Sequence, residues 1–194
     1  MKRVCVFCGS KTGKRPAYAE AARGLATAIV RRGLGMVYGA GQIGLMGILA
    51  DAALRAGGEV VGVIPQALVD KELAHSGLTQ MHIVGSMHER KARMADLSDA
   101  FIALPGAYGT ADEFFEILTW AQLGLHAKPT GLLNVEGFFD PLFAWLDHAV
   151  MESFLRRKHR QLILQSSDAD SLLDMLLHAQ PAPISPKWID DEER

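Results

Sequence analysis

The sequence has few cysteines and aromatic residues and lacks a long apolar run. Its 194 residues include 2 cysteines, and 7% of them are aromatic. Every apolar run is shorter than the roughly 18–20 residues that a membrane-spanning helix needs. The first residues, Met1 to Cys8, are basic and then apolar, but the apolar part is too short for a secretory signal and continues into a glycine. We therefore expect a cytoplasmic protein with no membrane partner.

The two cysteines, Cys5 and Cys8, form a C-x-x-C pair. Such a pair carries redox chemistry when it lies at the start of a helix, where the thiolate is stabilised. Here the surrounding apolar residues predict a strand, in which an offset of three directs the two side chains to opposite faces. The sequence contains no second C-x-x-C and no H-E-x-x-H among its 7 histidines. We expect two buried thiols, no metal site and no cofactor.

An excess of charge of one sign is also missing. The 20 Lys and Arg residues nearly balance the 22 Asp and Glu residues, which leaves a formal net charge of −2. This balance argues against broad binding to the phosphate backbone of a nucleic acid. The length and the 49% hydrophobic content are typical of one globular domain. Glycine is the one excess, with 19 residues, which is roughly 10% against a usual value of about 7%.

Predicted strands and helices alternate along the chain. Strands are expected at Arg3–Cys8, Gly35–Tyr38, Val60–Ile64, Met81–Val84, Ala100–Leu104, Thr130–Leu133 and Leu162–Leu164. Helices are expected at Pro16–Arg32, Gly44–Ala56, Met87–Leu97, Ala111–Leu123, Asp140–Glu152 and Ala169–His178, with an irregular connection at Gln66–Thr79. The strands are continuous apolar runs, which is typical of a parallel sheet covered on both faces. The pattern predicts an α/β fold with a doubly wound parallel sheet.

We expect a single domain over residues 1–180. After it, Pro181, Pro183 and Pro186 are followed by a short acidic run. This composition predicts a flexible C-terminal tail over residues 181–194.

Three glycine-bearing loops follow predicted strands. Gly9 and Ser10 follow the first strand, Gly39 and Gly41 follow the second, and residues 105–109 follow Ala100–Leu104. Ligands of a doubly wound sheet bind at the carboxyl ends of its strands. Glycine lets backbone N–H groups approach a ligand closely, and helix N-termini add positive partial charge. The three loops together predict a site for a ligand that carries a phosphate.

Two well-known phosphate-binding motifs fit this site less well. Residues 39–44 read G-x-G-x-x-G, which is typical of NAD-binding folds when an acidic residue ends the next strand. Glu59 has the right spacing, but it precedes Val60–Ile64 and is therefore expected at the opposite edge of the sheet. Residues 9–15 are similar to a P-loop, but three residues instead of four separate the glycines, and Arg15 replaces the Ser or Thr that binds magnesium. An NAD site is thus disfavoured, and an NTPase is excluded.

Glu113 has two interpretations. Residues 110–113 read T-x-x-E, a capping box in which Thr110 and Glu113 only close the start of a helix. Alternatively, Glu113 faces a sugar beside the phosphate loop, where a carboxylate activates water and stabilises an oxocarbenium-like centre. Glu116 lies one turn further along and can share that face. On a neighbouring predicted helix, Arg90 and Lys91 supply positive charge near the same edge of the sheet.

Several motifs together resemble one known family. They are Cys8-Gly9-Ser10, Tyr38-Gly39-Ala40-Gly41 with Gly44-Leu45-Met46-Gly47, M-x-x-R-K-x-x-M around Arg90-Lys91, and PGAYGTADE over Pro105–Glu113. The combination, over about residues 2–178, resembles the LOG ("Lonely guy") family of cytokinin riboside 5′-monophosphate phosphoribohydrolases. The resemblance implies a Rossmann-like fold and a homodimer with active sites close to the subunit interface. It also implies hydrolysis of the N-glycosidic bond of adenine-type nucleoside 5′-monophosphates to the free base and ribose 5-phosphate.

The resemblance implies roles for individual residues as well. Arg90 and Glu113 would be the catalytic pair. The phosphate would be held by Gly106, Ala107, Tyr108, Gly109 and Thr110, with Ala111 and Asp112 beside them. The rest of the substrate site would comprise Glu72, Lys91 and Thr119 together with the loop residues Gly9, Ser10, Gly39 and Gly41.

Two alanines depart from the family pattern, because Ala40 and Ala107 stand where the family has glycine. If the position of Ala107 needed a positive φ, the alanine would cost ~1–2 kcal/mol. We expect an ordinary φ there, in which case the methyl group only reduces the space around the phosphate.

Other interpretations stay open at the level of sequence. One is a nucleotide- or cofactor-binding carrier without turnover, and another is a general AMP nucleosidase. The apolar residues of the helix around Glu113–Leu125, such as Phe115 and Trp120, fit either a core position or a partner surface.

Overall fold

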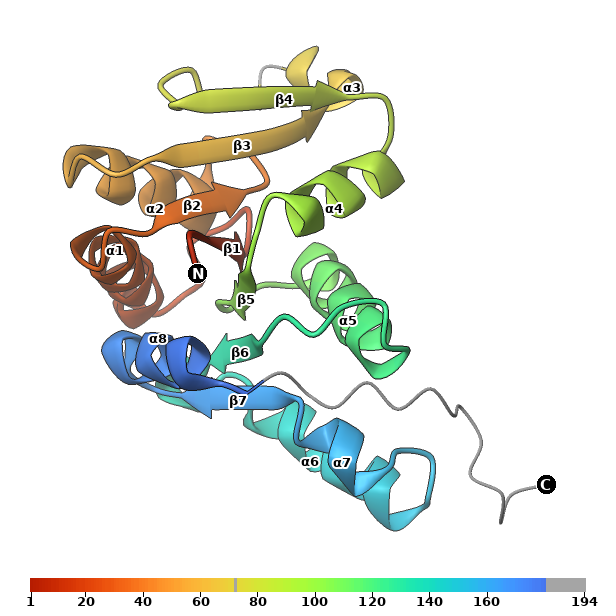
Figure 1. Cartoon of the computed structure of the whole chain (residues 1–194). Helices are drawn as coiled ribbons and strands as arrows, with labels where there is room; N and C mark the ends of the chain where they lie inside the picture. The colour runs from red at the N-terminus through yellow and green to blue at the C-terminus, as the bar shows by residue number, and fades with distance from the viewer. Residues whose placement is uncertain (72, 181–194) are drawn as a thin grey trace.

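The strands form one parallel sheet (Figure 1). In a computed structural model that describes residues 1–71 and 73–180, seven strands have the order β4-β3-β2-β1-β5-β6-β7. Their bounds are β1 Arg3–Phe7, β2 Gly35–Tyr38, β3 Val60–Pro65, β4 Gln80–Val84, β5 Ala100–Ala103, β6 Thr130–Leu133 and β7 Ile163–Ser166. Every neighbouring pair is parallel, which confirms the predicted α/β doubly wound fold in a single domain.

The order of the strands places a topological switch between β1 and β5. The chain runs outward from β1 through β2 and β3 to β4 and then returns to pair β5 with the other side of β1. The loops after β1 and β5 therefore leave the carboxyl edge of the sheet side by side, where such folds bind their ligands.

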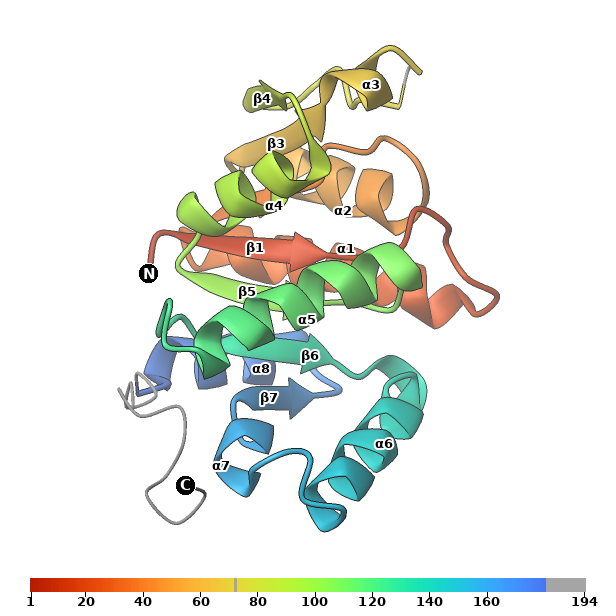
Figure 2. The ribbon, with the colours of Figure 1, turned by 90° about the vertical axis from the view of Figure 1, so that its right-hand side faces the viewer.

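Helices cover both faces of the sheet (Figure 2). On one face lie α1 Pro16–Arg31, α2 Gly44–Arg55 and α8 Ala169–His178, and on the other lie α4 Met87–Asp96, α5 Tyr108–Gln122 and α6 Asp140–Met151. Shorter helices are α3 Gln66–Val69, η1 Val135–Gly137 and α7 Arg157–Arg160. The alternation along β1 shows the two layers directly, because Val4 and Val6 join one core while Cys5 and Phe7 join the other.

The two cysteines belong to opposite core layers, as predicted. Cys5 packs with the core under α4 and α5, and Cys8 with the core under α1 and α2. Both are free, and burial raises the pKa of each thiol, so neither has the thiolate character of a redox cysteine.

Most predicted bounds are confirmed to within a residue or two, but the start of α5 is wrong. The helix begins at Tyr108 with Ala107 as its N-cap residue and no side-chain cap, whereas the sequence favoured a start at Ala111 with Thr110 as the cap. The reason is the close approach of the chain at Gly106, where a Cβ would lie 2.0 Å from Thr110 Oγ1, next to Pro105, whose carbonyl accepts a hydrogen bond from Gly9 N of the loop after β1 at 3.1 Å. Thr110 is thus inside the first turn, and the capping-box interpretation of Glu113 is wrong.

The two unusual alanines behave differently. Ala107 has a φ of −120°, so its side chain costs nothing there. Ala40 is fully buried with a φ of 57°, the left-handed region that costs a non-glycine residue about 1 kcal/mol or more. Tertiary contacts hold it there, because its carbonyl accepts a hydrogen bond from His75 N at 2.8 Å and Gly41 pairs with Ala74.

The structure does not describe the predicted tail, and it addresses the expected absence of a membrane partner only through the lengths and hydropathy of its helices. The predicted flexible tail, residues 181–194, lies outside the described residues. Within residues 1–71 and 73–180, no helix is both long enough and apolar enough to cross a membrane.

Gly44 allows the loop after β1 to rest on the start of α2. It has a φ of +65°, and a Cβ there would lie 2.2 Å from the carbonyl carbon of Ser10 and 2.4 Å from Lys11 N. We expect Gly44→Ala to reduce the free energy of unfolding by about 2 kcal/mol or more, because it adds backbone strain and a clash with a backbone that cannot move cheaply. Urea unfolding measures the change.

The matched control is Gly24→Ala. Gly24 is exposed in the middle of α1 and has no atom within 4 Å of its added Cβ, so alanine should stabilise the helix by about 0.5–1 kcal/mol. Equal effects of the two substitutions would contradict the role given to Gly44.

Candidate active site

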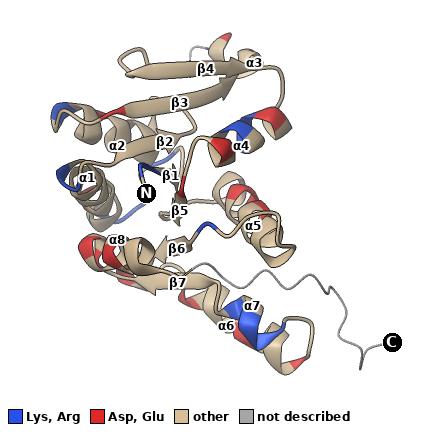
Figure 3. Ribbon diagram, viewed as in Figure 1, with Lys and Arg blue, Asp and Glu red and all other residues tan. Residues whose placement is uncertain are grey.

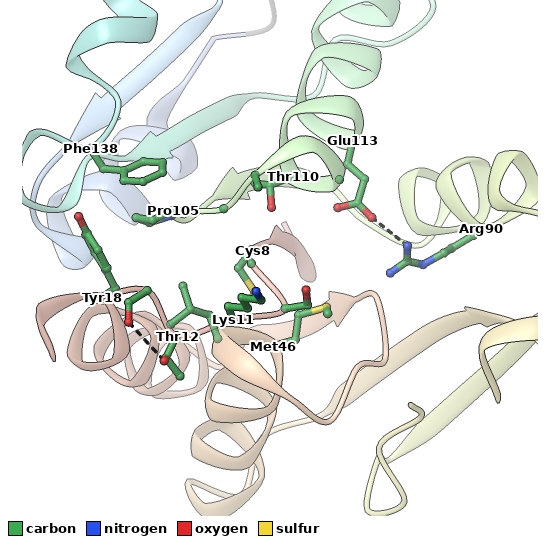
Figure 4. Close-up of a pocket in the computed structure, with 17 residues that line it drawn as sticks. Cys8, Lys11, Thr12, Tyr18, Met46, Arg90, Pro105, Thr110, Glu113 and Phe138 are labelled. Carbon is green, nitrogen blue, oxygen red and sulfur yellow. Dashed lines mark hydrogen bonds and ion pairs between the residues drawn. The ribbon is translucent and has the colours of Figure 1, made fainter. Parts of the chain in front are cut away.

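A cavity of about 440 Å³ opens where the loops after β1 and β5 meet (Figure 4). Its volume is within the range of small-molecule sites. The β1–α1 loop forms one wall, the start of α5 forms the opposite wall, and Arg90 and Glu113 close one end. The lining residues are Cys8, Gly9, Ser10, Lys11, Thr12, Gly13, Tyr18, Leu45, Met46, Arg90, Pro105, Gly106, Ala107, Gly109, Thr110, Glu113 and Phe138.

Arg90 is held by the ends of two strands. Its Nε donates to Val63 O and its Nη2 donates to Gly39 O, both at 3.0 Å. A Cβ on Gly39 would lie 1.8 Å from Nη2, so only glycine leaves room for the guanidinium. The start of α4 is fixed one turn earlier by Ser86, whose Oγ accepts from Glu89 N, and by Glu89, whose carboxylate accepts from Gly85 N. Arg90 is therefore fixed in place before any ligand binds.

Glu113 faces Arg90 from α5. Arg90 Nη1 and Glu113 Oε1 are 3.2 Å apart, and each side chain is only about one-tenth exposed (9% and 10%). Burial raises the pKa of the Glu113 carboxyl above its ordinary value, and the positive charge of Arg90 offsets part of that rise. The pair presents a buried carboxylate of altered basicity to the cavity, which is typical of a catalytic group.

Lys91 does not line the cavity but joins α4 to α5. Figure 3 shows that α4 carries basic and acidic residues and that α5 carries acidic ones. Its Nζ lies 3.0 Å from Asp112 Oδ2 and 2.9 Å from Glu116 Oε2. Burial lowers the pKa of Lys91, but the hydrogen bonds to Glu116 and Asp112 outweigh this and raise it overall. Neither Lys91 nor Asp112, to which the resemblance gives a substrate-binding role, lines the cavity. Their ion pair instead joins α5 to α4.

The N-terminus of α5 points into the cavity. No side chain caps it within the described part of the chain, and the first helical hydrogen bond runs from Ala111 N to Ala107 O. The N–H groups of the preceding residues, including Gly109 and Thr110, thus lack a partner within the helix. Gly106 makes this turn possible, because a Cβ there would lie 2.0 Å from Thr110 Oγ1. The arrangement suits an anion.

The structure brings together only part of the predicted site. Gly9, Ser10, Arg90, Gly106, Ala107, Gly109, Thr110 and Glu113 line the cavity. Tyr108 and Ala111 line a neighbouring apolar cavity, and Gly39 and Gly41 lie beneath Arg90 and Met46. Thr119 is exposed and outside the cavity, and its Oγ1 donates to Phe115 O at 2.7 Å. Glu72 lies outside the described residues.

Several lining residues were missed by the sequence analysis. Lys11 to Gly13 continue the Gly9-Ser10 loop, and the P-loop-like spacing of this segment was a signal that they approach the ligand. Tyr18 and Phe138 meet edge-on at 5.7 Å at the far end of the cavity, and they come from α1 and from the connection after β6. The contact between these two side chains depends on tertiary structure, so no local sequence pattern predicts it.

The chain is similar to proteins of one family. A family model described as "Possible lysine decarboxylase" matches residues 46–176. A probable cytokinin riboside 5′-monophosphate phosphoribohydrolase of Oryza sativa subsp. japonica is 52% identical over 175 residues, covering 90% of this chain and 77% of its own. A cytokinin riboside 5′-monophosphate phosphoribohydrolase of Arabidopsis thaliana is 48% identical over 180 residues, covering 93% and 79%.

The chain belongs to the LOG family. The fold of this LOG-family chain is shared more widely. A molybdenum cofactor binding protein from Rippkaea orientalis aligns over 91% of this chain and 96% of its own, with a TM-score of 0.69 and 19% identity. A molybdenum cofactor carrier protein from Chlamydomonas reinhardtii aligns over 92% and 99%, with a TM-score of 0.68 and 21% identity. At these identities the likeness concerns the fold alone. Among the described residues, no group of three or more His, Cys, Asp or Glu is placed to hold a metal ion.

The ion pair predicts how Glu113 titrates. Arg90→Met should raise the pKa of Glu113 further, because the carboxylate then stays buried without its nearest cation. A pH titration of ¹³C-labelled glutamate side chains by NMR measures this shift. Lys91→Met is the matched control and should shift the pKa less, since Lys91 offsets the rise more weakly than Arg90 does. An unchanged or lower pKa in Arg90→Met would contradict the pairing.

Proposed function

We propose that this LOG-family chain hydrolyses the N-glycosidic bond of adenine-type nucleoside 5′-monophosphates, including cytokinin riboside 5′-monophosphate and AMP. The products are the free base and ribose 5-phosphate. The observation that supports this most is the buried Arg90–Glu113 pair, 3.2 Å apart, at one end of a cavity that also contains the uncapped N-terminus of α5. Its 45–52% identical relatives are named cytokinin riboside 5′-monophosphate phosphoribohydrolases, which describes this activity on the first of the two substrates.

The phosphate of the substrate binds at the start of α5. There the N–H groups near Gly109 and Thr110 and the positive end of the helix favour an anion. A phosphate fixed at this point holds the ribose close to Glu113, whose carboxylate lies one turn further along the same helix. Phosphate binding energy thus serves to orient the reacting bond.

Glu113 acts on the sugar as the C1′–N9 bond breaks. The base departs with the electron pair of that bond and takes up a proton from the solvent, to which the proton later accepted by Glu113 returns, while positive charge develops on the ribose. The Glu113 carboxylate stabilises this charge and accepts a proton from the water whose oxygen bonds to C1′. Arg90 is a positioning residue for the carboxylate, since two strand-end carbonyls and Glu113 occupy its guanidinium.

A carrier without turnover is the alternative from another class. A protein that only binds an anion gains nothing from a buried carboxylate, because the two negative charges repel each other. The Arg90–Glu113 pair therefore favours catalysis. Comparing the kcat/KM for AMP with that for nucleotides that carry an N6 substituent measures which substrate the enzyme prefers.

Glu113→Gln tests the reaction. We expect kcat for base release to fall by about 10²–10⁴-fold, the usual contribution of such a group, while the KM for AMP changes only a few-fold. The assay measures free base and ribose 5-phosphate from AMP and from isopentenyladenosine monophosphate. Full activity in Glu113→Gln would remove Glu113 from the mechanism. Tight nucleotide binding by the wild-type protein with no release of base would favour the carrier.

We also propose a homodimer, as the family resemblance implies. Exposed apolar side chains at the end of α5, on α6 and just after α6 support it, namely Leu125, Trp145, Met151 and Phe154, which are 58–89% exposed. Phe115, by contrast, packs edge-on against Trp145 and partly against the core. The cytoplasmic location stays a prediction.

Phe154→Asp should weaken the dimer, because it places a charge in an apolar contact. Sedimentation velocity at micromolar concentration measures the oligomeric state. Leu177→Asp, on α8 at the opposite face of the sheet, is the control and should leave the dimer intact. A monomeric wild-type protein, or a Phe154→Asp variant that dimerises like the wild type, would contradict this surface.

A further inference from the structure

Positive charge in the cavity comes from two side chains. Of the described residues that line it, Lys11 and Arg90 are the cations and Glu113 is the anion. Arg90 and Glu113 neutralise each other, and further N–H groups of Arg90 donate to Val63 O, to Gly39 O and, at 4.0 Å, to Met87 Sδ. Arg90 therefore has little charge or hydrogen-bonding capacity left for a dianionic phosphate.

Lys91 cannot supply the missing charge either. Its ammonium group lies between Asp112 and Glu116, at 3.0 and 2.9 Å, and outside the cavity. The two cations Arg90 and Lys91 are thus outnumbered by three carboxylates, those of Asp112, Glu113 and Glu116. The net negative charge of these side chains disfavours an anion at this end of the cavity, so a phosphate at the start of α5 gains from a cation on another wall.

Lys11 is that cation. It is exposed on the cavity wall opposite Glu113, and its ammonium group has no hydrogen-bond or ion-pair partner among the described residues (Figure 4). Its backbone is fixed, because the Ser10–Lys11 peptide rests on Gly44 and Gly9 N donates to Pro105 O at 3.1 Å. That hydrogen bond carries the Lys11 loop alongside the start of α5, where the phosphate is proposed to bind.

We propose that Lys11 is the positively charged contact for the substrate's 5′-phosphate, and that it, together with the N-terminus of α5, selects phosphorylated over unphosphorylated nucleosides. This inference rests on the proposed function. Lys11 contributes a compact charge on a flexible stem, which closes on the phosphate after the helix N–H groups have bound it. It assigns the charge to a residue of the β1–α1 loop instead of to Lys91.

The test is the binding of ribose 5-phosphate, measured by titration calorimetry, to the full chain and to three variants. Lys11→Met should raise the Kd about tenfold or more, and Lys11→Arg should stay within a few-fold of the wild type. Lys14→Met removes the same charge from the same loop three residues later, outside the cavity, and should change the Kd by less than twofold.

A kinetic arm tests selectivity. The kcat/KM for AMP should fall in Lys11→Met, mainly through KM, while the kcat/KM for adenosine stays the same. The proposal is overturned if Lys11→Met binds ribose 5-phosphate like the wild type, if Lys14→Met weakens binding equally, or if the wild type does not bind this product. A wild-type protein that binds ribose 5-phosphate but releases no base would refute the proposed hydrolysis. The binding data for the Lys11 variants would still test the phosphate contact.

Discussion

The buried ion pair between Arg90 and Glu113 is the constraint on which the site depends. Removing two charges from water is costly, and the attraction between them often does no more than offset that cost. The pair is therefore poor evidence for stability and good evidence for function. It persists because the strand ends satisfy the guanidinium, through Gly39 O and Val63 O, and because Lys91 fixes the two helices that carry the pair. The parallel sheet makes this possible, since it brings the ends of β2 and β3 and the helices after β4 and β5 to one edge.

Close approach of backbones is the second requirement, and it explains where the glycines must be. Gly39 leaves space for the guanidinium, Gly106 lets the chain turn directly into α5, and Gly44 supports the peptide after Ser10. Each of these positions would bring a Cβ within about 2.2 Å of another atom. Ala40, by contrast, is a non-glycine residue with a positive φ, which the neighbouring segment around His75 holds in the left-handed region. Glycine thus sits where contact is tightest, and an alanine is tolerated where surrounding hydrogen bonds compensate for the strain.

The sequence was sufficient for the strands, the helices and the edge that carries the site, because continuous apolar runs and helical spacing are local signals. It failed where two local signals competed or where tertiary contacts decided. Thr110 and Glu113 have the spacing of a capping box, but the turn at Gly106 starts α5 three residues earlier, at Tyr108, and places Thr110 inside the helix instead of at its cap. The substrate-binding role that the resemblance implies for Lys91 stays a prediction, but no local pattern could show its ion-pair partners Asp112 and Glu116, which reach it only because α4 lies beside α5. Tyr18 and Phe138, which are far apart in the sequence, illustrate the same limit.

The balance of charge explains why the chain as a whole is nearly neutral although its substrate is an anion. A strongly basic surface would attract every polyanion, including nucleic acids, whereas a small site needs positive potential only where the phosphate binds. In the cluster of Arg90, Lys91 and three carboxylates the charges largely cancel, and burial raises the pKa of Glu113. Under the proposed mechanism, this cluster leaves Glu113 to act on the sugar and does not itself attract the phosphate. The start of α5 and Lys11 provide positive potential on the other side of the cavity. If the proposed roles hold, this separation in space lets one cavity bind an anion and stabilise a developing cation in the same substrate.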